Sequence, residues 1–292
     1  MQTHSTRSST PREPARYARA VHGFALVLAF SLATGSVAQA ATTMCTAHSP
    51  AHRVALIELY SSEGCNSCPP ADRWLGQWKG RGVPDSVVPL ALHVDYWNSL
   101  GWMDRFSQHR FTERQQSLTD LAGGHTIYTP EVFVSGRELR SWSQPSSFES
   151  RVQDVTAKPA QADVAIAVAP RVPPTAGALD VDATFTARTA GSDRLNAYVA
   201  VYENDLNTQV HAGENSGATL HHERVVRQWI GPVPLVAGYA RIHQDVALGA
   251  FDREAGGGTN LPASGNKFGV AAFVENAATG EVLQVADLAA CH

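Results

Sequence analysis

Two cysteines separated by two residues, Cys65 and Cys68, restrict the fold of this chain more than any other feature of its sequence. They follow an apolar run over residues 54–60 that is typical of a buried strand, and they precede a candidate helix over residues 71–79. At a helix start, two sulfurs at this spacing close a disulfide that stays open to attack, and the helix dipole stabilises a thiolate. The motif therefore predicts a redox-active pair in which Cys65 is the nucleophile and Cys68 resolves the mixed disulfide.

The elements around this motif follow one another in the order of a thioredoxin fold. After the first strand and helix, the pattern predicts a second buried strand, a polar helix, a hairpin and a last helix with a serine N-cap. These elements cover residues 87–94, 104–121, 131–135 with 138–142, and 146–157. We therefore expect an α/β thioredoxin-like domain over residues 53–158.

The sequence pattern changes after residue 158. Apolar and polar residues alternate with a period of two in short segments that are separated by clusters of proline and glycine. The six segments cover residues 163–169, 179–187, 195–202, 239–248, 267–275 and 282–288. This alternation predicts an all-β domain, an immunoglobulin-like sandwich, over residues 162–292.

Three further residues extend the candidate thiol site. Thr129 and Pro130 stand directly before the strand expected at residues 131–135, where a thioredoxin fold places a cis-proline opposite the thiols. The backbone of Thr129 is then expected to hold an extended substrate chain. Asp95 follows the second buried strand and is a candidate for relaying a proton to Cys68. The alternatives are an ordinary trans proline that opens an edge strand and an aspartate that only caps a loop.

The histidines give weaker signals. His93 lies at the end of the second buried strand and is a candidate base or metal ligand, or else a core histidine with satisfied hydrogen bonds. His221 and His222 are adjacent, so on a strand they point to opposite faces. We therefore do not expect these two to bind one metal ion together.

The first forty residues have the form of a signal peptide. A basic leader precedes an apolar run over residues 21–33, and Ala38, Gln39 and Ala40 form a small-x-small cleavage site. The run is too short to span a bilayer, so we expect no stable membrane insertion after cleavage and a periplasmic or secreted protein; the alternative is an uncleaved N-terminal anchor. Without residues 1–40 the chain has 19 basic and 26 acidic side chains, and this negative charge argues against binding to nucleic acid.

The two remaining cysteines, Cys45 and Cys291, lie near the ends of the exported chain. Four cysteines in an oxidising compartment allow three connectivities, and the spacing favours Cys65 with Cys68 and Cys45 with Cys291. A bond that closes so long a loop stabilises the folded chain by roughly 4 to 5 kcal/mol in the chain-entropy model. The outer pair is therefore expected to be a structural disulfide.

Several motifs together resemble one bacterial family. The stretch from Ser62 to Asp72 contains both cysteines of the pair, and it occurs with His93 to Trp97 and Tyr128 to Pro130. In the second half, residues 211–215 and 225–227 continue the resemblance. The chain resembles the DUF1223 family, secreted proteins of unknown function with a thioredoxin-like fold. The resemblance implies a fold and export, and it implies no reaction.

The sequence thus favours an exported thiol–disulfide oxidoreductase that needs no bound cofactor and acts on protein or small-thiol substrates. One alternative is a copper(I)-binding, metallochaperone-like protein that holds the ion with Cys65, Cys68 and His93, since soft thiolates suit that ion. Another is a non-catalytic interaction protein in which the Cys65–Cys68 bond is only structural. The sequence does not indicate an oligomeric state.

Overall fold

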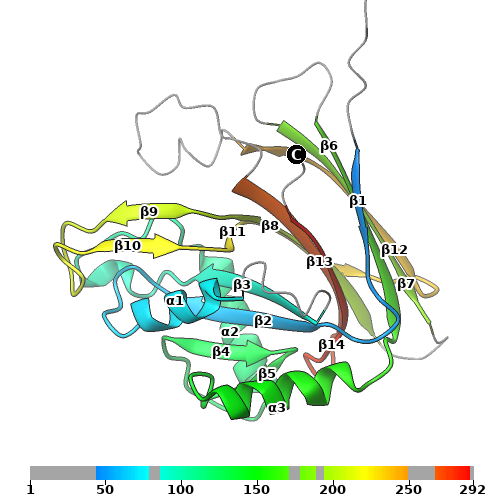
Figure 1. The fold of residues 1–292 in the computed structure, drawn as a ribbon, viewed down its shortest axis with the longest axis horizontal. Coiled ribbons are helices and arrows are strands. Elements are labelled where there is room, and N and C mark those ends of the chain that lie inside the picture. Colours follow the sequence, from blue (N-terminus) through cyan, green and yellow to red (C-terminus); the bar gives the residue numbers. More distant parts are fainter. Residues whose placement is uncertain (1–43, 79–85, 171–177, 189–193, 249–266, 290–292) are drawn as a thin grey trace, which may run out of the picture. The chain divides into compact units, whose positions relative to one another are not determined.

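The computed structural model describes residues 44–78, 86–170, 178–188, 194–248 and 267–289. In these ranges the chain forms three α-helices and fourteen strands, so it is mostly β (Figure 1). The helices are α1 (Pro69–Gly76), α2 (His109–Leu121) and α3 (Pro145–Thr156), and a short 3-10 helix, η1, covers Asn98–Leu100. The strands are β1 (Cys45–His48), β2 (Ala55–Ser61), β3 (Val87–His93), β4 (Glu131–Val134), β5 (Arg137–Glu138), β6 (Ala162–Pro170), β7 (Ala178–Ala187), β8 (Leu195–Glu203), β9 (Leu206–Gln209), β10 (Thr219–His222), β11 (Val225–Pro234), β12 (Tyr239–Ala247), β13 (Phe268–Asn276) and β14 (Val282–Leu288).

These strands form three sheets. The largest is an eight-stranded mixed sheet in the order β14-β13-β8-β11-β3-β2-β4-β5. In it β2 is parallel to β3 and antiparallel to β4, while β8 is antiparallel to both β11 and β13. A four-stranded antiparallel sheet has the order β1-β6-β7-β12, and β9 pairs with β10 in a hairpin of its own.

The predicted fold class, an α/β thioredoxin-like domain followed by a separate immunoglobulin-like sandwich, is wrong. The large sheet combines strands from both halves of the chain, because β11 pairs with the free edge of β3 at Val225 and Ala91. The Arg224 side chain is buried at this junction and donates from Nε to the Pro89 carbonyl at 2.8 Å. Gln284, on β14, donates to the carbonyls of residues 50 and 52 and so ties the C-terminal strands to the segment before β2.

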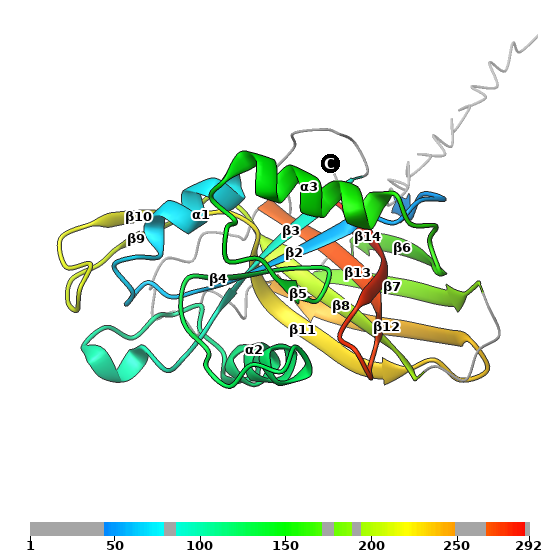
Figure 2. The same ribbon diagram turned by 90° about the horizontal axis from the view of Figure 1, so that it is seen from below.

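Helices cover both faces of the sheet around β2 (Figure 2). All seven residues of β2 are buried, which is typical of a strand with cover on both sides. Leu56 and Tyr60 belong to an apolar cluster that includes Phe111 and Leu118 of α2. The alternate residues of β2 lie in another cluster with side chains of α1 and α3, among them Leu75 and Phe148. The C-terminal end of β2, and the segment that follows it, are therefore held in a fixed position.

A further core lies between the four-stranded sheet and the C-terminal part of the large sheet. Val164, Val181 and Ile242 contribute to it from one sheet, and Val199 and Val270 from the other. No helix in the described ranges is long and apolar enough to cross a membrane. Residues 1–40, the predicted signal peptide, lie outside the described residues.

Candidate functional site

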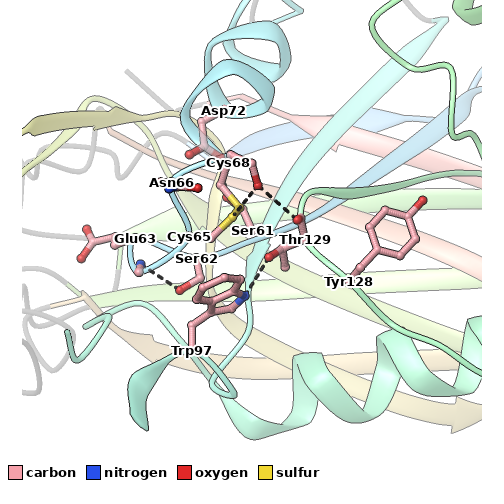
Figure 3. Close-up of a disulfide and its surroundings, with 12 residues drawn as sticks. Ser61, Ser62, Glu63, Cys65, Asn66, Cys68, Asp72, Trp97, Tyr128 and Thr129 are labelled. Carbon is pink, nitrogen blue, oxygen red and sulfur yellow. Dashed lines mark hydrogen bonds between the residues drawn. A yellow bond between two sulfur atoms is a disulfide. The ribbon is translucent and has the colours of Figure 1, made fainter. Parts of the chain in front are cut away.

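The structure contains a disulfide between Cys65 and Cys68, with the two Cα atoms 5.5 Å apart (Figure 3). Cys68 is the N-cap residue of α1, and its carbonyl accepts from the backbone N–H groups of Ala71 and Asp72. The two prolines after Cys68 occupy the first helical positions, where a backbone N–H has no partner within the helix and its absence costs little. Cys65 lies before this turn, so the disulfide bond closes across the start of the helix.

The segment just before β4 lies against this disulfide. The Thr129–Pro130 bond is cis, and the Thr129 carbonyl accepts from the Ser67 hydroxyl at 3.4 Å. Ser67 Oγ is also 3.3 Å from Cys65 Sγ. Trp97 donates from Nε1 to Thr129 Oγ1 at 2.7 Å (Figure 3). The structure thus brings Cys65, Cys68 and Thr129 together.

The loop between β9 and β10 is hydrogen-bonded to the backbone around this disulfide. Asn215, in this loop, donates from Nδ2 to the carbonyls of Glu63 and Cys65, at 2.8 and 3.0 Å. Glu214 accepts from the backbone N–H of Asn66 at 3.1 Å. Both cysteines have no exposed surface, whereas the side chains between them are exposed. A reactant therefore reaches the sulfurs only when a covering group moves.

Asp95 is hydrogen-bonded to α2 in the structure, and its role as a proton relay to Cys68 stays a prediction. Its carboxylate accepts from the Thr112 hydroxyl at 2.6 Å and lies 3.0 Å from His109 Nδ1, at the start of α2. Its partial burial acts to raise the pKa, but the Thr112 and His109 hydrogen bonds lower the pKa of Asp95 below its ordinary value. The structure therefore places Asp95 where it anchors α2 beside the end of β3.

His93 lies instead in a buried histidine–carboxylate cluster, defined by Glu63, Asp72, His93, Asp104 and His222. His93 Nδ1 is 2.7 Å from an Asp104 oxygen. His222 lies between two carboxylates, with Nε2 3.4 Å from Glu63 Oε1 and Nδ1 3.6 Å from Asp72 Oδ2. The two imidazole rings meet edge to face, with centroids 5.0 Å apart. All five residues are buried.

The pKa values of His222 and Asp104 in this cluster differ clearly from their ordinary values. Burial acts to lower the pKa of His222, but the carboxylates of Asp72 and Glu63 outweigh burial and raise this pKa to about 10. Burial acts to raise the pKa of Asp104, yet its interaction with His93 and two backbone N–H donors bring this pKa below its ordinary value. The carboxylates of Asp72 and Glu63 therefore favour a positive charge at the position of His222.

The sequence pointed to only one member of this cluster. His93 was a candidate, whereas Glu63, Asp72, Asp104 and His222 were not assigned to a site. Asp72 had a usable signal, because it lies one helical turn after Cys68 on the same face of α1. His221 and His222 do point to opposite faces of β10, where His221 is exposed and His222 is buried. His222 therefore faces Glu63, Asp72 and His93 in the interior.

Two other predicted pairings have different outcomes. Cys45 lies on β1, and Cys291 lies outside the described residues, so their disulfide stays a prediction. A copper(I) site of Cys65, Cys68 and His93 needs two free thiolates. In the structure those two sulfurs are bonded to each other.

Comparison with known proteins identifies the family. Residues 56–253 match the sequence profile of a family described as "Protein of unknown function (DUF1223)". The chain belongs to the DUF1223 family. The match includes the disulfide, Thr129 and all five residues of the buried histidine–carboxylate cluster. No curated protein matches this sequence.

Two solved structures resemble this DUF1223 protein in fold. Protein AGR_C_4864 from Agrobacterium tumefaciens is 20% identical, and the match covers 82% of this chain and 96% of that protein with a TM-score of 0.54. HBP35 of Porphyromonas gingivalis is 14% identical, and the match covers 82% of this chain and 76% of that one with a TM-score of 0.59. At these identities the likeness concerns the fold alone.

Proposed function

We propose that this protein is an exported thiol–disulfide oxidoreductase, periplasmic or secreted, that works through Cys65 and Cys68. The observation that carries the proposal is the disulfide closed across the start of α1, with the Ser67 hydroxyl 3.3 Å from Cys65 Sγ and within reach of the Thr129 carbonyl. A thiolate at Cys65 would accept a hydrogen bond from Ser67. Charge-assisted hydrogen bonds of this kind favour the thiolate, which is the species that reacts.

The exchange begins when a substrate thiolate attacks Sγ of Cys65. The Cys65–Cys68 bond breaks, its electron pair leaves on Cys68, and the substrate is joined to Cys65 as a mixed disulfide. A second thiolate of the substrate then attacks the substrate sulfur and releases Cys65. The substrate dithiol becomes a disulfide, and the cysteine pair takes up two electrons and two protons. The reverse sequence reduces a substrate disulfide.

In this proposal the Thr129 backbone and the loop between β9 and β10 control how a substrate docks beside the disulfide. Thr129 offers backbone groups beside the sulfurs to which an extended protein substrate can hydrogen-bond. Asn215 and Glu214 hold the loop between β9 and β10 to the backbone around the disulfide. We therefore expect this loop to open before a protein substrate docks. Small thiols need a smaller opening, so we expect them to react faster than proteins.

The experiment measures insulin reduction by the mature chain and its Cys65→Ala variant, together with the redox potential of the Cys65–Cys68 couple in the mature chain. We expect Cys65→Ala to have only background activity, while the matched variant Asn66→Ala, whose exposed side chain lies between the cysteines, retains the activity. Cys68→Ala should accumulate a mixed disulfide, because Cys65 then has no resolving thiol. Equal insulin reduction by the wild type and Cys65→Ala would refute the proposal.

Alkylation separates a reactive pair from a structural disulfide. After mild reduction without denaturant, an exchanging pair reacts with iodoacetamide, and Asn215→Ala should react faster because two hydrogen bonds of the covering loop are lost. A pair that resists both reduction and alkylation until the protein is unfolded would make the disulfide structural.

A further inference from the structure

Three side chains of the buried histidine–carboxylate cluster direct donor atoms toward one another. Asp72, His93 and His222 each offer one atom, and these three atoms all lie within 4.8 Å of one another. The donors come from three different elements, namely α1, the end of β3 and the end of β10. Metal–ligand distances near 2.1 Å put such donors at most about 4 Å apart. A bound ion therefore requires the side chains to approach by less than about 1 Å.

Each of these three side chains is held on its far side by a second group. Asp104 lies 2.7 Å from His93 Nδ1, so Nε2 of that ring faces the other donors. Glu63 lies 3.4 Å from His222 Nε2, on the side of the ring away from Asp72. Ser61 donates to Asp72 Oδ1 at 2.8 Å and leaves Oδ2 toward His222. Carboxylates behind ligating histidines are the usual way in which proteins fix the ring and raise its basicity.

Several buried atoms of the cluster make no hydrogen bond. They are Nε2 of His93, both ring nitrogens of His222 and Oε1 of Glu63. Of these, His222 Nε2 and Glu63 Oε1 lie 3.4 Å from each other, on the side of the ring away from Asp72. His93 has no exposed surface and His222 is 1% exposed, so bulk water does not compensate for these missing bonds. A buried polar atom without a partner is costly, and unpartnered ring nitrogens on both histidines of one potential ligand set indicate that a ligand supplies the partner.

The charge of the cluster points to the kind of ligand. Glu63, Asp72 and Asp104 bring three buried carboxyl groups together, and two imidazoles are the only basic groups among the five residues. Buried carboxylates need a compensating cation or hydrogen bonds. Imidazole nitrogen with carboxylate oxygen is a donor set that suits divalent first-row transition metals.

We propose that Asp72, His93 and His222 bind one divalent transition-metal ion, through one carboxylate oxygen and two imidazole nitrogens, with Glu63 and Asp104 orienting the histidines. The site is separate from the thiol chemistry, because the sulfurs of Cys65 and Cys68 take no part in it. It therefore exists in the oxidised protein.

The experiment titrates zinc into the chelator-treated, oxidised mature chain and follows binding by calorimetry. We expect one ion per chain and a rise of the unfolding midpoint with zinc concentration, since a ligand that binds only the folded state stabilises it. His222→Ala should weaken binding at least 100-fold, whereas His221→Ala, the exposed neighbour on the same strand, should bind as the wild type does. His243→Ala tests the exposed group of Asp180, His243 and Asp245, the other set of potential ligands in the described ranges, and should also bind normally.

A spectroscopic measurement keeps the proposal testable where His222→Ala fails to fold. Cobalt(II) bound to the oxidised wild type should give visible d–d bands without the near-ultraviolet charge-transfer band that thiolate ligands produce. His93→Gln, which has a similar volume, should lose these bands. The proposal is overturned if the oxidised wild type binds neither ion, if a folded His222→Ala binds zinc as tightly as the wild type, or if only His243→Ala loses it.

Discussion

Replacing Glu131 with glutamine is expected to stabilise the protein above neutral pH and to have little effect in mild acid. Glu131 is 1% exposed and accepts from Gln115 Nε2 at 2.6 Å. Burial, opposed by this hydrogen bond and assisted by Glu138, raises the pKa of Glu131 from 4.5 to about 7. In Glu131→Gln the amide oxygen can still accept from Gln115, so the substitution removes the charge and keeps the contact.

The sign follows from proton binding in the two states. Between pH 4.5 and 7 the folded state holds a proton that the unfolded state has lost, so the free energy of unfolding falls as the pH rises. This loss of unfolding free energy is absent well below pH 4.5 and complete above about pH 7. Integrated between pH 5 and pH 8, a pKa of about 7 in place of 4.5 corresponds to roughly 2.5 kcal/mol at most. Partial solvation of the site reduces this value, and we expect about 1 to 2.5 kcal/mol.

Urea unfolding of the wild type and Glu131→Gln at pH 5 and pH 8 measures this quantity. From pH 5 to pH 8, the free energy of unfolding of Glu131→Gln should rise relative to that of the wild type by about 1 to 2.5 kcal/mol. Glu149→Gln makes the same change on the exposed face of α3 and corrects for the altered net charge. A difference between wild type and Glu131→Gln that stays constant with pH would refute the reasoning, because it would mean that Glu131 titrates alike in both states.

Two further substitutions test the packing of the large sheet. Arg114 forms ion pairs with the buried Glu58 and Glu275, at 2.5 and 2.9 Å. Arg114→Met should therefore lower the free energy of unfolding in urea by about 3 to 5 kcal/mol, whereas Arg140→Met, at an exposed ion pair, should not. Equal unfolding midpoints for the two variants would contradict this. A Cβ at Gly136 would lie 1.8 Å from the Gly280 carbonyl oxygen, whereas one at Gly123 meets nothing within 4 Å, and both residues have positive φ. Gly136→Ala should therefore cost about 1 to 3 kcal/mol more than Gly123→Ala, and equal losses would show that the turn moves to make room.

The local elements were accessible to sequence reasoning because each has a simple period. The strands at β2 and β3 and the helices at α2 and α3 lie within a few residues of their predicted positions. The partner of the β3 edge was not predicted. β11 contains Gly231 and Pro232 and has two register shifts, so it lacks the regular alternation that identifies a strand. β11 joins the N-terminal and C-terminal strands of the large sheet. Because the sequence does not predict β11, the strands of this one sheet were expected in two separate domains.

The candidate site likewise has a part that the sequence predicts and a part that only the fold brings together. The Cys65–Cys68 bond and the cis bond before Pro130 follow from local patterns, and both are present. The buried histidine–carboxylate cluster depends on contacts between residues up to 159 positions apart, from Glu63 to His222. No local period relates these positions, and only the arrangement of β9 and β10 beside α1 brings His222 to His93.

The two sites share one helix, and this decides which variants can separate them. Asp72 lies one turn after Cys68, and its backbone N–H donates to the Cys68 carbonyl at 3.1 Å. The Asp72 side chain also accepts from the Ser61 hydroxyl at 2.8 Å. A substitution at Asp72 therefore removes a contact between α1 and the end of β2 as well as a proposed metal ligand, and a loss of thiol reactivity in such a variant has two explanations. His222 is on β10 and has no backbone hydrogen bond to α1. A folded His222→Ala chain that loses zinc and still reduces insulin would show that the metal and the thiols act independently, whereas loss of both would mean that the ion holds α1 in the position that the disulfide requires.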